Sequence, residues 1–158
     1  MAILAWLVFV GFAVPLAVVD ARQHRLPNRI LLLAVPAGLA ALASTAGVTG
    51  DWVAVPRILS GSILTCLGLL VFALISRGAM GMGDVKLGLF TGAYLGWLGW
   101  GAIAWGTILG MMTAGVFAMA LLIMKRADRR TPIPLGPFLL GAVGVLGIAS
   151  MVNAGIMA

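Results

Sequence analysis

Long stretches without a charged side chain constrain the fold of this chain more than any other feature of its sequence. Residues 1–19, 30–50, 58–76 and 87–124 contain no Lys, Arg, Asp or Glu. A helix of about 20 apolar residues crosses the roughly 30 Å hydrocarbon core of a bilayer. Charged residues make up only 9% of the 158 residues, whereas a soluble protein has roughly 25%. The sequence therefore predicts an all-α integral membrane protein.

The run 87–124 is too long for one crossing. Its 38 residues would form a helix of about 57 Å at ~1.5 Å per residue, nearly twice the thickness of the core. The segment Gly96-Trp97-Leu98-Gly99-Trp100-Gly101 is the natural place for a turn, because Gly weakens a helix and Trp favours the membrane interface. A last crossing follows Pro132 and Pro134. We therefore predict six transmembrane helices.

The basic residues support this count and indicate the orientation. With six crossings, one side of the membrane carries nine of the ten Lys and Arg residues: Arg22, Arg25, Arg29, Arg77, Lys86, Lys125, Arg126, Arg129 and Arg130. Arg57 faces the other side, whereas five crossings would divide the ten equally. Because cytoplasmic loops carry the excess of Lys and Arg, we expect both termini on the non-cytoplasmic side. The whole chain, 1–158, is predicted to be a single transmembrane domain.

Several kinds of site and partner are not expected. The membrane topology accounts for the net charge of +6, so no nucleic-acid partner is predicted. Cys66 is the single cysteine, which leaves no disulfide framework and no cysteine-based zinc site. His24 is the only histidine and lies in a basic loop, whereas metal sites need several ligands. We expect neither a metal nor a cofactor.

The acidic residues are so few that each can be considered by itself. They are Asp20, Asp51, Asp84 and Asp128, and the chain has no Glu. Asp51 lies in a short outer turn and Asp128 in a strongly basic loop, where carboxylates are ordinary. Asp20 directly follows the first uncharged run. The simple interpretation of Asp20 is an interfacial carboxylate neutralised by a nearby arginine.

Asp84 is harder to explain as a structural residue. It lies in Gly81-Met82-Gly83-Asp84-Val85-Lys86, just before the fourth predicted helix. The glycines predict non-helical backbone there, which persists near membrane depth only when it is buried in protein or lines a wet cavity. An ionisable residue in such a place is a functional-site hypothesis by default. The alternative is that Asp84 caps the helix, a role that Asp fills well.

Asp20 and Asp84 are predicted on the same side of the membrane, each at the cytoplasmic end of a helix. Two carboxyl groups within hydrogen-bonding reach share one proton, because both cannot ionise cheaply. The ionised group can take a proton from water while the protonated group polarises a carbonyl. The pair could therefore hydrolyse a peptide bond. Two alternatives remain open: a small proton-coupled transporter that uses the same carboxylates, and a non-catalytic scaffold built on Gly-rich helix packing.

Three short segments form an ordered set around these residues. Asp20 is followed by Leu26-Pro27-Asn28, Asp84 lies within Gly81-Met82-Gly83-Asp84-Val85-Lys86-Leu87, and Pro132-Ile133-Pro134-Leu135-Gly136-Pro137-Phe138-Leu139 opens the last predicted helix. The set resembles the type IV prepilin peptidase family, membrane aspartyl proteases of the GxGD type. That family has Ile-Pro-Asn after its first catalytic Asp, a GxGDxKL signature and an Ile-Pro-Phe-Gly-Pro-Phe segment. The resemblance covers essentially the whole chain, with Leu26 and Leu135 as conservative departures.

The resemblance implies an aspartic endopeptidase of the bacterial inner membrane that removes the basic leader of type IV prepilins or pseudopilins. Asp20 and Asp84 would be its catalytic pair. Residues that would support the site or the substrate are Gly81, Gly83, Lys86, Pro27, Asn28, Pro134, Gly136 and Pro137. The Gly81–Gly83 loop would accommodate an extended substrate strand, and Pro134-Gly136-Pro137 would offer it unpaired backbone groups. Lys86 would bias the Asp pair or contact the substrate, unless it serves only the topology.

The resemblance also limits the expected activity. Many bacterial members carry a cytoplasmic N-terminal region with paired CxxC motifs, which methylates the newly exposed N-terminus. This chain has one Cys and no room for such a region before Asp20, so no methyltransferase activity is expected. It resembles the short, peptidase-only form often associated with Flp or tight-adherence pili. The expected partners are a prepilin or pseudopilin substrate and membrane lipid.

Overall fold

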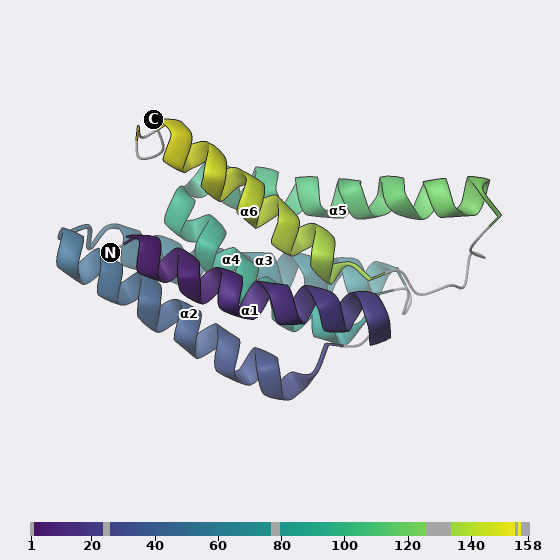
Figure 1. Ribbon diagram of the computed structural model, residues 1–158, viewed down its shortest axis with the longest axis horizontal. Coiled ribbons are helices and arrows are strands. Elements are labelled where there is room, and N and C mark those ends of the chain that lie inside the picture. Colours follow the sequence, from purple (N-terminus) through teal and green to yellow (C-terminus); the bar gives the residue numbers. More distant parts are fainter. Residues whose placement is uncertain (1, 24–25, 77–79, 126–133, 154, 156–158) are drawn as a thin grey trace.

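The fold is a bundle of α-helices. The computed structural model describes residues 2–23, 26–76, 80–125, 134–153 and 155. They form α1 (Ala2–Gln23), α2 (Asn28–Thr49), α3 (Ala54–Ile75), α4 (Met82–Leu98), α5 (Trp100–Ile123) and α6 (Gly136–Asn153). The start of α1 and the end of α6 lie at the same end of the bundle (Figure 1), as an even number of crossings requires. The prediction of an all-α membrane protein is confirmed.

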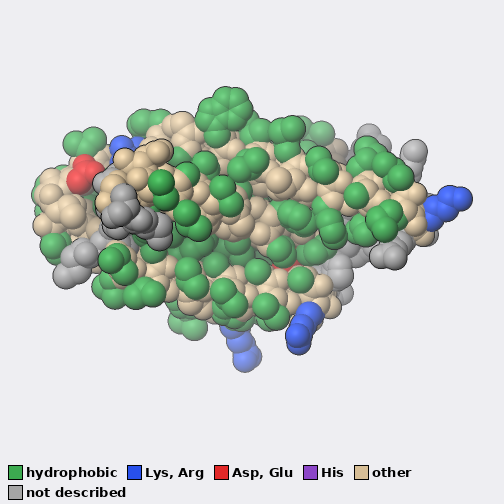
Figure 2. Space-filling model, turned by 45° about the horizontal axis from the view of Figure 1, so that its top comes forward, with side chains coloured by type: hydrophobic (Ala, Val, Ile, Leu, Met, Phe, Trp, Pro, Cys, Tyr) green, Lys and Arg blue, Asp and Glu red, His purple; other side chains and the backbone are tan. Residues whose placement is uncertain are grey.

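Five helices, all except α4, are long and apolar enough to cross a membrane. Their outer faces carry large apolar side chains, such as Trp105 and Val116 on α5, which are 70% and 69% exposed. Hydrophobic side chains likewise cover most of the face seen in Figure 2. Large apolar side chains cost free energy when they are exposed to water but not when they are exposed to lipid. The exposed apolar faces therefore agree with the predicted spans.

α4 differs from the other helices because protein encloses it. It has 17 residues, at the short limit of about 17–25 for a spanning helix, and 11 of the 17 are buried. It packs against α2, α3, α5 and α6. Tyr94 extends these contacts to α1, because its hydroxyl donates a hydrogen bond to the Ala5 carbonyl at 2.9 Å. The Asp-bearing helix is therefore the central one.

The predicted division of the long apolar run is confirmed. α4 and α5 are joined by Gly99 alone, whose φ of +140° is one that other residues rarely adopt. Its N–H donates to the Leu95 carbonyl at 3.0 Å, which satisfies one of the last carbonyls of α4. This turn lies within the expected segment 96–101.

The start of α4 differs from the prediction. The helix begins at Met82, so Gly83 and Asp84 belong to its first turn, and the preceding Gly81 is extended, with φ −74° and ψ 144°. Gly costs about 1 kcal/mol in a helix, but close packing overrides this preference. A Cβ on Gly83 would lie 2.9 Å from the Leu26 Cβ. The expected Gly81–Gly83 loop is therefore wrong, and Gly81 rather than Asp84 is the N-cap.

α3 and α4 approach each other through glycines. A Cβ on Gly61 would lie 2.6 Å from the Gly92 carbonyl oxygen, and one on Gly96 would overlap backbone atoms of α3. Gly92 and Gly96, four residues apart on α4, thus act as a packing device. A second pair at the same spacing, Gly106 and Gly110, is also enclosed, by leucine side chains of α4 and α6.

A Gly92→Ala variant is expected to lower the free energy of unfolding by about 1–3 kcal/mol, because overpacking forces the backbones apart. The added Cβ would lie 2.7 Å from Thr65 Cβ and would overlap the Gly61 carbonyl oxygen. The unfolding temperature of the purified protein in detergent would measure the loss. Gly68→Ala on α3 is the control, because no atom lies within 4 Å of its new Cβ. Equal unfolding temperatures for the two variants would contradict the close α3–α4 packing.

Arg57 contributes to stability in a way that its sequence position did not indicate. Its Nε donates to the Gly96 carbonyl at 2.7 Å and its Nη2 to the Trp97 carbonyl at 3.1 Å. These carbonyls end α4, where the helix leaves acceptors without intrahelical donors and favours a cation. Arg57 therefore caps the C-terminus of α4 from α3.

Candidate functional site

Asp20 lies in the last turn of α1 and faces the interior of the bundle. Its side chain is 3% exposed, and Leu16, one turn earlier on the same face, is fully buried. Its Oδ2 accepts a hydrogen bond of 2.9 Å from the backbone N–H of Gly136, the first residue of α6. Arg22 is exposed, and Arg25 lies outside the described residues. Asp20 is thus a buried group that joins two helices rather than a solvated carboxylate at the interface.

Asp84 lies in the first turn of α4 and is 8% exposed. Its backbone N–H donates to the Gly81 carbonyl at 3.1 Å, and its side chain accepts a hydrogen bond from the Gly81 backbone. The other carboxyl oxygen, Oδ1, is buried and has no hydrogen-bond partner among the described residues. An orphaned buried carboxyl oxygen costs free energy and requires an explanation.

The start of α6 lies between Asp20 and the helix that carries Asp84. A Cβ on Gly136 would lie 2.6 Å from Asp20 Oδ2 and 3.4 Å from Leu87 Cδ2, and Leu87 is one turn beyond Asp84 on α4. Asp20 and Asp84 are close enough to interact electrostatically. The end of α1 and the start of α6 lie at one end of the bundle (Figure 1). The structure therefore brings the two predicted catalytic residues into one buried site.

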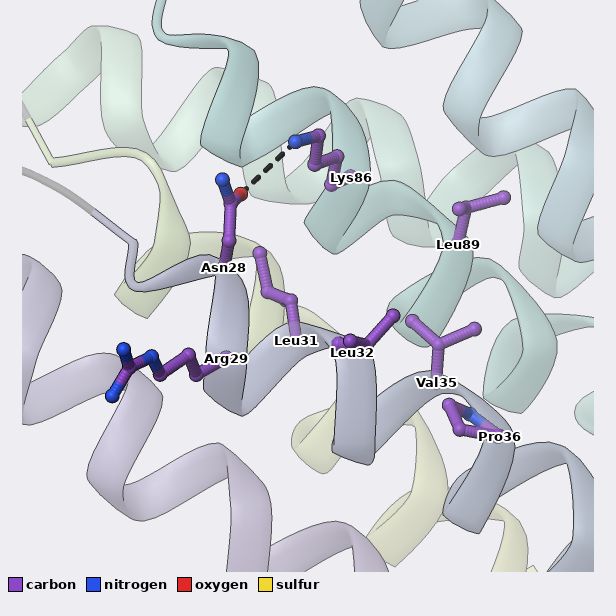
Figure 3. A pocket seen from close by; sticks show the side chains of 8 residues that line it. All are labelled: Asn28, Arg29, Leu31, Leu32, Val35, Pro36, Lys86 and Leu89. Atoms are coloured by element: carbon purple, nitrogen blue, oxygen red, sulfur yellow. Dashed lines mark hydrogen bonds between the residues drawn. The ribbon is translucent and has the colours of Figure 1, made fainter.

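The segment after Asp20 connects to the segment around Asp84. Pro27 is extended, with φ −69° and ψ 121°, and forms the N-cap of α2, while Asn28 is its first residue. Leu26 packs against Gly83, and Lys86 Nζ donates to Asn28 Oδ1 at 2.9 Å (Figure 3). Pro27 and Asn28 thus start α2, and the two contacts hold α2 beside the N-terminus of α4.

Lys86 itself points away from the Asp pair. It is two residues from Asp84 on a helix, so the two side chains leave opposite faces. It is exposed and bonds to Asn28, whereas Asp84 is buried. This geometry gives Lys86 a structural partner on α2 and argues against a direct effect on the carboxyl groups.

The predicted role of Pro134, Gly136 and Pro137 changes in one respect. The N–H of Gly136 is already donated to Asp20, and proline has no N–H. These three residues therefore have no free backbone N–H to offer a substrate strand, and the prediction of unpaired backbone groups is narrowed to their carbonyls. Gly136 instead positions Asp20.

Some predicted residues lie outside the described part of the chain. These are His24, Arg25, Arg77, Arg126, Asp128, Arg129, Arg130, Pro132 and Ile133. Asp51 is described; it is exposed in the α2–α3 turn, away from the site, as expected.

Two contacts of the site were not predicted from the sequence: the one between Leu26 and Gly83 and the one between Gly136 and Asp20. In a single sequence, a glycine that allows close approach cannot be distinguished from a glycine that breaks a helix.

Comparison with known proteins identifies the family. Residues 7–124 match the family model of the type IV leader peptidase family, which is more than half of the chain. The chain belongs to the type IV leader peptidase family. The matched region contains Asp20 and Asp84 and extends from α1 to the end of α5. The resemblance seen in the motifs is therefore confirmed.

Individual members of the type IV leader peptidase family are similar over much of the chain. A prepilin leader peptidase/N-methyltransferase of Bacillus subtilis is 29% identical over 130 residues, which are 82% of this chain and 49% of that protein. The protein of the same description from Pseudomonas aeruginosa is 28% identical over 129 residues, 78% and 42% of the two chains. The chain thus spans at most about half the length of these curated relatives. No solved structure matches it.

Proposed function

We propose that this chain is an aspartic endopeptidase of the GxGD type that removes the leader peptide of type IV prepilins or pseudopilins. The observation that carries the proposal is the meeting of two buried carboxyl groups, Asp20 and Asp84, at one end of a membrane bundle. Family membership supports the substrate class. The resemblance to the short form makes Flp or tight-adherence prepilins the first substrates to test, and no methyltransferase activity is proposed for these 158 residues.

Different surroundings suggest different roles for the two acids. Asp20 accepts the first N–H of α6, and a helix N-terminus stabilises negative charge. Asp84 has a buried oxygen without a described partner, a place that favours a neutral carboxyl group. We assign Asp20 as the ionised base that takes a proton from water and Asp84 as the protonated acid that donates a hydrogen bond to the scissile carbonyl.

In the proposed hydrolysis of the peptide bond, protons move between water, the two acids and the substrate. Water attacks the carbonyl carbon while its proton passes to Asp20, and the carbonyl oxygen takes the proton of Asp84. The resulting tetrahedral diol collapses, the C–N bond breaks, and Asp20 gives its proton to the leaving amine. Asp84 recovers a proton from the new carboxyl group. Neither acid is consumed, so the pair is ready for another turnover.

The distribution of basic residues supports a site at the cytoplasmic face of the inner membrane. Arg22 and Lys86 lie in the same helix ends as Asp20 and Asp84, whereas Arg57 and Asp51 lie at the opposite end, near the α2–α3 turn. The positive-inside rule assigns the end that carries the basic residues to the cytoplasm. The basic leader of a prepilin stays on that side, so the scissile bond can reach the acids. A transporter would need its carboxyl groups nearer the midplane.

Incubation of the purified protein in detergent with a prepilin peptide tests the proposal. The peptide contains a basic leader, a Gly before the scissile bond and an apolar helix after it. We expect cleavage directly after that Gly, read from the masses of both products. An uncleaved peptide, together with proton flux carried by the protein in liposomes, would instead support the transporter alternative.

A further inference from the structure

A groove of about 500 Å³ opens between α2 and α4, on the side of α4 that faces away from Asp84. Eight residues line it: Asn28, Arg29, Leu31, Leu32, Val35, Pro36, Lys86 and Leu89 (Figure 3). From Asn28 to Pro36 the groove follows α2 for about 12 Å at ~1.5 Å per residue. It therefore extends from the proposed cytoplasmic interface toward the membrane interior.

The two ends of the groove differ in chemistry. Leu32, Val35, Pro36 and Leu89 form apolar walls at the deeper end, whereas the polar lining residues gather at the start of α2 (Figure 3). None of the eight lining residues is acidic. The groove thus combines a positive end at the interface with an apolar channel below it, which is the polarity of one phospholipid.

Lys86 can serve an additional anionic partner. Its ammonium group carries three N–H donors, and one of them makes the bond to the neutral Asn28 amide. This bond holds the ammonium over the mouth of the groove without neutralising its charge. Arg29 adds a second cation at the edge, although its guanidinium points away from Lys86 in Figure 3.

The charge of the groove favours an anionic lipid over the substrate. Lys86 and Arg29 make one end of the groove positive, and this end would repel a basic leader. An acyl chain is much thinner than a helix, and basic pockets between transmembrane helices on the cytoplasmic side bind anionic head groups.

We propose that this groove binds an anionic phospholipid of the inner leaflet. Its phosphate contacts Lys86, and one acyl chain lies along Leu32, Val35 and Leu89. The proposal rests on the orientation given under the proposed function, but it does not require peptidase activity. A bound lipid would bridge α2 and α4 beside the Leu26–Gly83 contact and so support the helix that carries Asp84.

Native mass spectrometry of the detergent-solubilised protein, equilibrated with phosphatidylglycerol or phosphatidylcholine of the same acyl chains, tests the proposal. We expect tighter retention of phosphatidylglycerol. Lys86→Gln should weaken its apparent affinity about fivefold, since one basic residue near an anionic lipid contributes about 1 kcal/mol. Lys125→Gln at the end of α5 is the charge-matched control and should bind as wild type does. Equal losses in both variants, or equal retention of both lipids, would overturn the proposal.

A second pair of variants tests the shape of the groove rather than its charge. Val35→Trp fills the channel and should reduce phosphatidylglycerol binding several-fold, whereas Leu33→Trp, on an exposed face of α2 that does not line the groove, should not. An Asp84→Asn protein should bind lipid normally, so a failure of the peptidase proposal is distinguishable from a failure of this one. Loss of prepilin binding in Val35→Trp with unchanged lipid retention would assign the groove to the substrate instead.

Discussion

Replacement of Asp84 by Asn is expected to slow removal of a prepilin leader by about 10²- to 10⁴-fold, the usual contribution of general acid–base catalysis. The amide keeps the shape of the carboxyl group but cannot transfer its proton to the scissile carbonyl. Asp20→Asn should cause a similar loss, because the amide is a far weaker base for water. The rate of product formation by purified protein measures both effects.

The combination of the two variants separates catalysis from folding. If Asp20 and Asp84 act as one unit, the double variant should be little slower than either single variant. Asp51→Asn is the matched control, because Asp51 is exposed in the α2–α3 turn, and it should cleave at the wild-type rate. Undiminished cleavage by Asp84→Asn would remove the carboxyl pair from the mechanism.

Gly136→Ala is expected to reduce kcat by about 100-fold, although Gly136 has no chemistry of its own. An added Cβ would lie 2.6 Å from Asp20 Oδ2 and 3.2 Å from Asp20 Cγ. Either the carboxyl group or the start of α6 must move, and the 2.9 Å bond from Gly136 N–H is weakened or lost. A displacement of about 1 Å can cost 10²-fold in rate. Steady-state kinetics would show the change mainly in kcat.

Gly141→Ala on the same helix is the control, because among the described residues no atom outside the adjacent backbone of α6 lies within 4 Å of its new Cβ. It should keep the wild-type rate. The unfolding temperatures of both variants in detergent should show that both are folded at the assay temperature, so that the loss in Gly136→Ala comes from the position of Asp20. Equal activity of the two variants would contradict the proposed positioning role of Gly136.

The helices were predictable from the sequence because lipid restricts the backbone conformations that a membrane-spanning segment can adopt. Backbone groups in a bilayer must be satisfied internally, so uncharged runs such as 30–50 and 58–76 predict helices directly. Length alone required a break within 87–124, and Gly99 provides it. The buried pair was also indicated, since with four acidic residues in the chain the motifs singled out Asp20 and Asp84.

The local geometry was not predictable in the same way. Gly83 suggested a break in the helix, yet it is helical because Leu26 packs where a side chain would otherwise be. Gly136 was expected to serve the substrate, but it donates to Asp20, 116 residues earlier. Arg57 was counted only for topology and caps α4. Each of these roles depends on a residue far away along the chain.

The sequence by itself determined that this chain is a helical membrane protein and how it is divided into helices, because hydropathy and charge act locally along the chain, and its motifs predicted Asp20 and Asp84 as the catalytic pair. The tertiary structure alone decided that α4 is enclosed, that Gly136 lies between Asp20 and Leu87, and that a groove with a positive mouth opens beside α2. These features arise from close packing between helices. Packing depends on which side chains are in contact in the folded protein, and a single sequence does not show which distant residues come into contact.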